Sequence, residues 1–403
     1  MAEQAVNTPH KAFRGSLEGQ VVTIPSIYKL IPGWQPNLHE GYKRARDDEL
    51  GPWLFCAADF GRFAAVWVPN SQSYRVLCTA AKYFAWYFVY DDIFDCGSLK
   101  HDQRAAENYR QSSLQYFQFT LLGLGSLPEL SGFDSELQNA LHSWDEVGEH
   151  IREVYSENTR KVLCDEMIRY VGSLNNVDSI FRDNDLPSVE EYWNRREATA
   201  GVYCVVATIP FIYGVDIEQA DIKIPAMRDL WKHTSYSSND MFSLRKELGE
   251  NQIENLIPVL ILNCGLDCNT AMQKSYQLLH NEAEGLQHAK SRLFHSSQQV
   301  SPNISAAFIK GYLDTTMGLA HWSYCGARYF KSWEQDDQNV IKFTVQGQTQ
   351  RKSEINLNEQ VQGPGSVTWY RFLPIQIFFI TPTIFSLVAL MARSTGFRWF
   401  SRG

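Results

Sequence analysis

Three carboxylates stand within one helical turn of this chain, at Asp91, Asp92 and Asp95. If the segment is helical, Asp91 and Asp95 share one face, because residues four apart lie one above the other, whereas Asp92 points aside. Like charges at this spacing repel each other unless a cation lies among them. Oxygen ligands of this kind suit Mg²⁺, which is often shared with substrate phosphates. The cluster therefore predicts a metal site, with a solvated acidic helix face as the plainer alternative.

The turns before these acids are almost continuously aromatic over residues 83–90. On a helix, Phe88 and Phe84 share roughly the face of Asp91. An oxygen-rich rim is therefore expected to lie on an aromatic wall.

A second polar cluster occurs at Asn239, Ser243 and Glu247. Their spacing of four residues places an amide carbonyl, a hydroxyl and a carboxylate in one stripe along a helix. Such a stripe fits a cation chelated from one helix, and Lys246 stands beside it to meet an anion bound to the same metal. An ordinary amphipathic surface helix is the alternative.

A third cluster joins Arg328 and Tyr329, six and seven residues after Trp322. Arginine offers a rigid fork of donors for phosphate oxygens, tyrosine adds a hydroxyl, and tryptophan offers a π face for a cation. Aromatic packing with a surface ion pair is the competing interpretation.

Together these motifs resemble those of class I terpene synthases of fungal type. Asp91 to Asp95 matches their DDxxD motif, and Asn239, Ser243 and Glu247 match the NSE triad in its NDxxSxxKE form. Arg328 and Tyr329 match the RY pair. These three motifs and a fourth at residues 192–201 occur in the family's order. The resemblance covers approximately residues 24–330.

The fourth match is the segment 192–201, which resembles the YxxxRxxTxG motif that carries the pyrophosphate-sensing arginine. This register assigns the role to Arg196, with Arg195 as the fallback. A capping box at Ser188 and Glu191 predicts the start of the helix that bears both arginines.

The resemblance implies three Mg²⁺ ions and a diphosphate. Asp91 would be the principal ligand on one helix, with Asp95 acting through water, and the triad would supply the ligands of the other helix. The residues implied in diphosphate binding and catalysis are Arg196, Lys246, Arg328 and Tyr329. Breaking an allylic C–O bond leaves an anion and a carbocation, so metals and arginines would act on the first and aromatic faces on the second.

The carbocation must also be kept from water. The candidates for the cavity wall are Phe84, Phe88 and Trp322, with Tyr203 in addition, and plain core packing is the alternative for each. Gly201 lies where a helix break would expose a backbone carbonyl to the cavity, although it could equally serve close packing.

The predicted fold is all-α: a single class I terpenoid synthase helical bundle around a central cavity, with a hydrophobic C-terminal extension. A chain of 403 residues with 44% hydrophobic residues is ample for one large core. The expected divisions are a polar N-terminal segment (1–23), the synthase domain (24–335), a polar linker (336–371) and a hydrophobic tail segment (372–392).

The tail segment 372–392 carries no formal charge and is flanked by Trp369, Tyr370 and arginines. Its length suits a membrane span, and its flanks suit membrane interfaces, against which Pro374 and Pro382 count. We favour a tail anchor over a strap folded against the enzyme or an extension from an incorrect gene boundary. The scattered cysteines and polar N-terminus predict a cytoplasmic enzyme, which this segment would tether to an internal membrane.

The sequence thus predicts Mg²⁺-dependent cyclisation of a prenyl diphosphate, with farnesyl diphosphate as the favoured substrate and a sesquiterpene as the product. A catalytically silent isoprenoid-binding protein and an isoprenyl diphosphate synthase are the alternatives. The net charge of −8 and the absence of a basic stripe argue against nucleic acid as a partner. Product skeleton and oligomeric state have no signal in the sequence.

Overall fold

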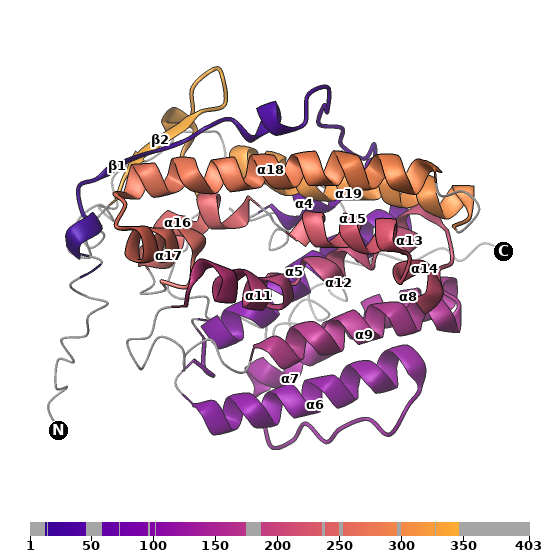
Figure 1. Ribbon diagram of the computed structural model, residues 1–403. Helices are drawn as coiled ribbons and strands as arrows, with labels where there is room; N and C mark the ends of the chain where they lie inside the picture. Colours follow the sequence, from indigo (N-terminus) through magenta and orange to yellow (C-terminus); the bar gives the residue numbers. More distant parts are fainter. Residues whose placement is uncertain are drawn as a thin grey trace, which may run out of the picture.

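The computed structural model is predominantly helical, which confirms the predicted all-α bundle (Figure 1). The structure describes residues 13, 15–45, 59–71, 73–95, 97–100, 102–174, 187–235, 238–249, 253–295, 300–326 and 328–345.

The first half of the chain supplies the elements β1 (Val21–Ile24), η1 (Ile27–Leu30), α2 (Tyr42–Arg44), α4 (Phe60–Trp67), α5 (Tyr74–Asp95), α6 (Gln103–Leu122), α7 (Ser135–His142), α8 (Asp145–Val154) and α9 (Glu157–Ser173). The second half supplies α11 (Val189–Thr199), α12 (Val202–Val206), α13 (Ile209–Tyr213), α14 (Gln219–Ile222), α15 (Pro225–Ser235), α16 (Asn239–Gly249), α17 (Leu256–Cys264), α18 (Cys268–His295), α19 (Pro302–Cys325), η3 (Ser332–Glu334) and β2 (Ile341–Thr344).

Side-chain caps fix where several helices begin. Asp102, Asp134 and Ser156 each accept a hydrogen bond from the backbone N–H three residues on, which satisfies one of the free donors at a helix start. The predicted capping box is confirmed at α11: Ser188 Oγ accepts from Glu191 N at 3.2 Å, and Glu191 Oε2 accepts from Ser188 N at 2.8 Å. The register of the helix that carries the two candidate arginines is therefore set by its own sequence.

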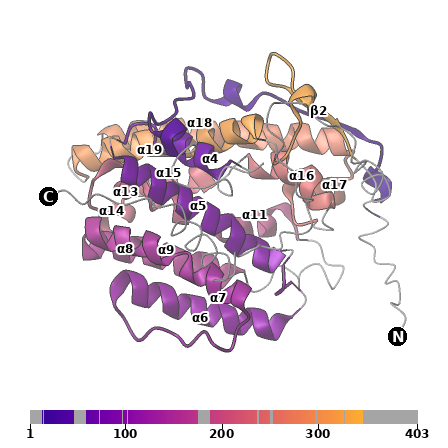
Figure 2. The same cartoon turned by 180° about the vertical axis from the view of Figure 1, so that it is seen from behind.

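The helices pack in layers around α5. In Figure 1, α18 and α19 run along one side of the molecule and α6 along the other, with α5 between them, and Figure 2 shows the same order from behind. The α4 helix joins α5 to α19, and α6 packs on α9. Large aromatic side chains such as Trp144, Trp322 and Tyr90 are fully buried between these layers. This packing places the acidic C-terminal end of α5 within reach of α9 and α16.

The two described strands pair with each other. Strands β1 and β2 are antiparallel, with Val21 opposite Thr344 and Ile24 opposite Ile341. The predicted boundary at residue 335 therefore falls before β2, and the folded domain extends through Val345, whose N–H donates to the Gln20 carbonyl at 3.0 Å. Residues 336–345 belong to the domain and not to a linker.

Within the described ranges, none of the helices is both long enough and apolar enough to cross a membrane. The predicted tail segment 372–392 lies outside the described residues, so its role as an anchor stays a prediction.

Candidate active site

The Asp-rich turn closes α5, and Asp91 is buried against α9. The Tyr170 hydroxyl donates a hydrogen bond to Asp91 Oδ1 at 2.7 Å. Burial raises the pKa of Asp91 and the charge of Asp92 raises it further, while Tyr170 and the positive charges of Arg196 and Lys246 act in the opposite direction. Any cation placed beside Asp91 would therefore stabilise its ionised form.

The other two acids of the turn have different surroundings. The sequence predicts that Asp92 points aside from the face of Asp91 and Asp95, and its Oδ1 lies 3.9 Å from Lys246 Nζ and 4.0 Å from Arg328 Nη2. The rotation of about 100° per residue turns Asp92 toward α16 and the RY segment and not toward solvent. Asp95 is the last residue of α5, and its side chain lies outside the described part of the structure.

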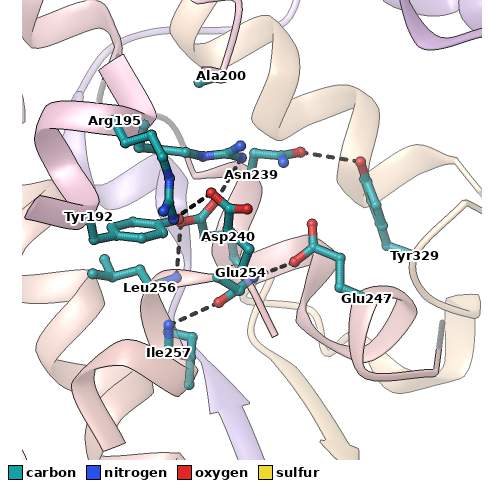
Figure 3. A network of polar contacts seen from close by, with 12 residues as sticks. Tyr192, Arg195, Ala200, Asn239, Asp240, Glu247, Glu254, Leu256, Ile257 and Tyr329 are labelled. Atoms are coloured by element: carbon teal, nitrogen blue, oxygen red, sulfur yellow. Dashed lines mark hydrogen bonds and ion pairs between the residues drawn. The ribbon is translucent and has the colours of Figure 1, made fainter. Parts of the chain in front are cut away.

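The predicted oxygen stripe lies on α16, which begins at Asn239 and carries Ser243 and Glu247 at successive turns. Asn239 Oδ1 accepts a hydrogen bond from the Tyr329 hydroxyl at 3.2 Å, and Figure 3 shows these two side chains facing each other. Ser243 is buried on the same helix. The structure thus brings the first residue of the triad to the RY pair.

Glu247 is also buried, and Asn255 Nδ2 donates to its Oε2 at 2.8 Å. Burial raises the pKa of Glu247, as does the charge of Asp240, whereas Arg196, Asn255 and Ser243 lower it. Two carboxylates, one on α5 and one on α16, are therefore held where neutralising positive charge would be favourable.

Arg196 pairs with Asp240 of α16, and its charge acts on both acidic clusters. Its Nη2 is 2.8 Å from Asp240 Oδ1, and its charge lowers the pKa of both Asp91 and Glu247. Asp240 also accepts hydrogen bonds from the Tyr192 hydroxyl and, at 3.2 Å, from the Leu256 N–H. In Figure 3, Asp240 lies beside Tyr192 at the centre of the polar network.

Arg195, the alternative candidate for the sensing arginine, pairs with a different carboxylate. Arg195 Nη2 lies 2.5 Å from Glu254 Oε1. Burial raises the pKa of Glu254 to about 7, against the opposing charges of Arg195 and Arg196. The charge of Arg196, and not that of Arg195, is among those that lower the pKa of Asp91 and Glu247, which favours Arg196 for a role toward a shared anion, and this assignment stays a prediction.

Three of the predicted wall residues meet in one aromatic cluster. Phe88 lies 5.4 Å from Trp322 between ring centroids, and Phe63 stacks on Trp322 at 4.9 Å and contacts Phe84 at 4.5 Å. The Arg328 guanidinium lies 4.9 Å above the Phe88 ring. Phe84 and Trp322 are almost fully buried, which fits core packing as well as a cavity floor.

Tyr203 belongs to a different aromatic group. Its ring meets Trp231 edge-on at 5.7 Å, and its hydroxyl donates to Glu197 Oε1 at 2.6 Å. The structure therefore does not bring Tyr203 to the cluster formed by the other three wall candidates.

Gly201 marks the predicted helix break. It separates α11 from α12 with a left-handed φ of 62°, a conformation that glycine adopts without steric cost. The Tyr87 hydroxyl donates to the preceding Ala200 carbonyl at 3.2 Å, and a Cβ atom at Gly201 would lie 1.7 Å from that hydroxyl oxygen. The predicted break is present, and Tyr87 of α5 binds the Ala200 carbonyl beside it.

Several contacts of the site were not predicted from the sequence. Asp240 lies inside the NDxxSxxKE motif, so the sequence offered a signal that it belongs to the site. Tyr170 and Asn255 lie outside the motifs, and the fold alone brings them to Asp91 and Glu247.

The residues present fit a hard divalent cation. The donors are carboxylate, amide and hydroxyl oxygens, which are the ligands that Mg²⁺ prefers. Over the residues that the structure describes, no group of three His, Cys, Asp or Glu side chains converges on one point. A cation here would therefore depend on Asn239 and Ser243 as well as on Asp91 and Glu247.

Comparison with known proteins agrees with this geometry. Residues 82–284, half of the chain, match the family described as terpene synthase family 2, C-terminal metal binding. The chain belongs to this family. The predicted resemblance to fungal class I terpene synthases is confirmed, and the protein is a terpene cyclase acting on a prenyl diphosphate.

Two fungal relatives match this terpene synthase along most of their length. It is 26% identical to the sesquiterpene cyclase hepA of Aspergillus oryzae, over 82% of this chain and 94% of the relative. It is 21% identical to the terpene cyclase braA of Annulohypoxylon truncatum, over 79% of this chain and 89% of the relative.

Solved structures share the fold. Wild-type cucumene synthase matches with a TM-score of 0.59 at 18% identity, covering 72% of this chain and 98% of that one. The structure of α-eudesmol synthase matches with a TM-score of 0.60 at 15% identity, covering 72% and 97%.

Proposed function

We propose that this terpene synthase is a Mg²⁺-dependent sesquiterpene cyclase that ionises farnesyl diphosphate, closes the carbocation into a ring and releases diphosphate. The observation that carries the proposal is the position of Arg196, whose charge acts on both Asp91 and Glu247. A diphosphate bound between α5 and α16 would meet this arginine and the metal-binding acids together. The similarity to the sesquiterpene cyclase hepA supports a C15 substrate.

The residues proposed to hold three Mg²⁺ ions are Asp91, Asp95, Asn239, Ser243 and Glu247. Bound Mg²⁺ would supply positive charge to the departing diphosphate. The side chains of the protein would orient that anion: Lys246 and Arg328, which lie beside Asp92, and the Tyr329 hydroxyl, which lies beside Asn239. Donors fixed in advance at a developing charge lower the barrier because they need no reorganisation during the reaction.

The aromatic cluster supports the second half of the reaction. Once the C–O bond has broken, the allylic cation needs surroundings that stabilise charge and exclude water. We assign this task to Phe88 and Trp322, with Phe84 connected to them through Phe63, because π faces attract cations. The Ala200 carbonyl at the Gly201 break offers a further negative dipole.

The test is incubation of the full chain with farnesyl diphosphate and MgCl₂, followed by gas chromatography and mass spectrometry of the organic extract. A cyclic C15 product that disappears with EDTA is expected. Geranyl and geranylgeranyl diphosphate, tested in parallel, decide chain length, and Glu247→Gln is the matched inactive control. No product from any of the three substrates would favour a silent isoprenoid-binding protein, and a longer prenyl diphosphate formed with isopentenyl diphosphate would favour a chain-elongating synthase.

A further inference from the structure

Arg245 lies on α16 between Ser243 and Glu247 but turns to the segment that follows the RY pair. Its Nη2 donates to the Tyr329 carbonyl at 2.5 Å and to Glu334 Oε2 at 3.0 Å. Its Nη1 donates to Glu334 Oε1. This is a bidentate arginine–carboxylate pair, which fixes orientation as well as distance.

Residues of α16 hold Tyr329 at both its backbone and its side chain. Its carbonyl accepts from Arg245, and its hydroxyl donates to Asn239 at 3.2 Å, so both restraints come from α16. The preceding Arg328 reaches in the other direction, toward Asp92 on α5 at 4.0 Å. The position of the RY pair between the two metal-binding helices therefore depends on how its backbone is held.

Glu334 is itself held in place. Its Oε2 accepts a hydrogen bond from the N–H of Lys331, the residue that precedes η3, at 2.8 Å. The Arg245 guanidinium also lies 5.0 Å above the Phe330 ring and 5.5 Å above the Phe343 ring of β2. One arginine thus connects α16, the RY segment and the β1–β2 sheet.

We propose that Arg245 and Glu334 are positioning residues that hold Tyr329, and through its backbone Arg328, in the geometry that binds the diphosphate of the substrate. The inference rests on the proposed function, because it gives that diphosphate site its support. A lysine at position 245 would keep the charge but could not bind the Tyr329 carbonyl and both Glu334 oxygens with one planar fork.

The test measures binding of inorganic diphosphate with MgCl₂ by titration calorimetry on the full chain. Glu334→Gln keeps the shape of the side chain and should weaken diphosphate binding about tenfold, the effect of one lost charge-assisted hydrogen bond. Arg245→Lys should act in the same way. The double variant should bind no more weakly than the worse single variant, because both act through one contact.

The matched control is Asp229→Asn, which removes another arginine–carboxylate pair, Arg292 Nη2 to Asp229 Oδ2 at 2.5 Å, between α18 and α15. Melting temperatures are measured for every variant, and the control should bind diphosphate as the wild type does. Wild-type affinity in Glu334→Gln would overturn the positioning role and leave the proposed function standing. Absence of binding in the wild type itself would overturn both.

Discussion

Tyr170 is the neutral group that binds Asp91 directly. Replacing it with phenylalanine removes a hydrogen bond to a buried carboxylate. Because Tyr170 lowers the pKa of Asp91, its loss disfavours the ionised form that a metal requires. Tyr170→Phe is therefore expected to raise the Mg²⁺ concentration for half-maximal activity about tenfold, as a lost hydrogen bond to a charged group implies. The measurement is a Mg²⁺ titration of the initial rate.

Tyr109→Phe controls for this change, since the Tyr109 hydroxyl is also buried and donates to a backbone carbonyl, that of Leu137, at 2.9 Å. An equal shift in both variants would contradict a specific effect of Tyr170 on Asp91.

Replacing Arg196 and replacing Arg195 should cause different defects, one in activity and the other in stability. Arg196→Ala removes the charge that acts on both acidic clusters and should lower kcat/KM about 100-fold or more, by analogy with lost transition-state donors. Arg195→Ala breaks the pair with Glu254 and should mainly lower the melting temperature. Steady-state kinetics and thermal unfolding of both variants decide the matter. If Arg195→Ala loses more activity, the register of the sensor motif is wrong by one residue.

At the level of helices, the break between α11 and α12 depends on one glycine. Gly201→Ala combines a left-handed φ with a clash against Tyr87, so it should cost about 3 kcal/mol or more of unfolding free energy. Gly214→Ala is the matched control, because Gly214 has a φ of 63° with no atom within 4 Å of the added Cβ. It should cost about 1 kcal/mol. Equal losses in denaturant unfolding would show that Tyr87 does not constrain the break.

The contact between η1 and α19 should make stability depend on pH. Burial, with the charge of Arg62, lowers the pKa of His321 from 6.5 to about 4, and the Tyr28 hydroxyl lies 2.7 Å from its Nδ1, with Cys325 Sγ also beside the ring. As pH falls below 6.5, the unfolded chain binds a proton that the folded chain does not. The stability that neutral His321 contributes is therefore fully present above pH 6.5 and is lost as the pH falls from 6.5 to about 4.

His321→Gln removes that dependence. The difference in unfolding free energy between wild type and variant, measured by urea unfolding at several pH values, should shrink steadily from pH 7 to pH 4.5. A difference that is constant over this range would contradict the lowered pKa.

Local patterns explain which elements could be predicted. The capping box at Ser188 and the stripe on α16 depend on residues within a few turns, and both helices formed as expected. Strand β2 could not be predicted, because its partner lies at the other end of the domain and a strand of four residues has little signal of its own. The partners of Asp92 could not be predicted for a similar reason: helical spacing gives the direction of its side chain, but only tertiary packing brings Lys246 and Arg328 to it.

For the molecule as a whole, the sheet predicts where the catalytic domain ends. A chain ending after Val345 should keep the melting temperature of the full protein. A chain ending after Gln335 loses β2 and uncovers Val22 and Ile24, which are fully buried. Exposing these side chains should lower the melting temperature by about 5 °C or more. Calorimetric scans of the two shortened chains and the full chain provide the measurement, and equal melting temperatures would show that the sheet contributes nothing.

The pairing of Val21 with Thr344 also has a consequence during synthesis. Strand β1 leaves the ribosome early, yet its partner is translated only after all the helices in the described part of the chain. Until then, helix α18 can pack on β1, but the edge of β1 that pairs with β2 is open to extended segments of other chains. The bundle can begin to fold as it emerges, but closure of this sheet is a late event that must await release of the C-terminal part of the domain.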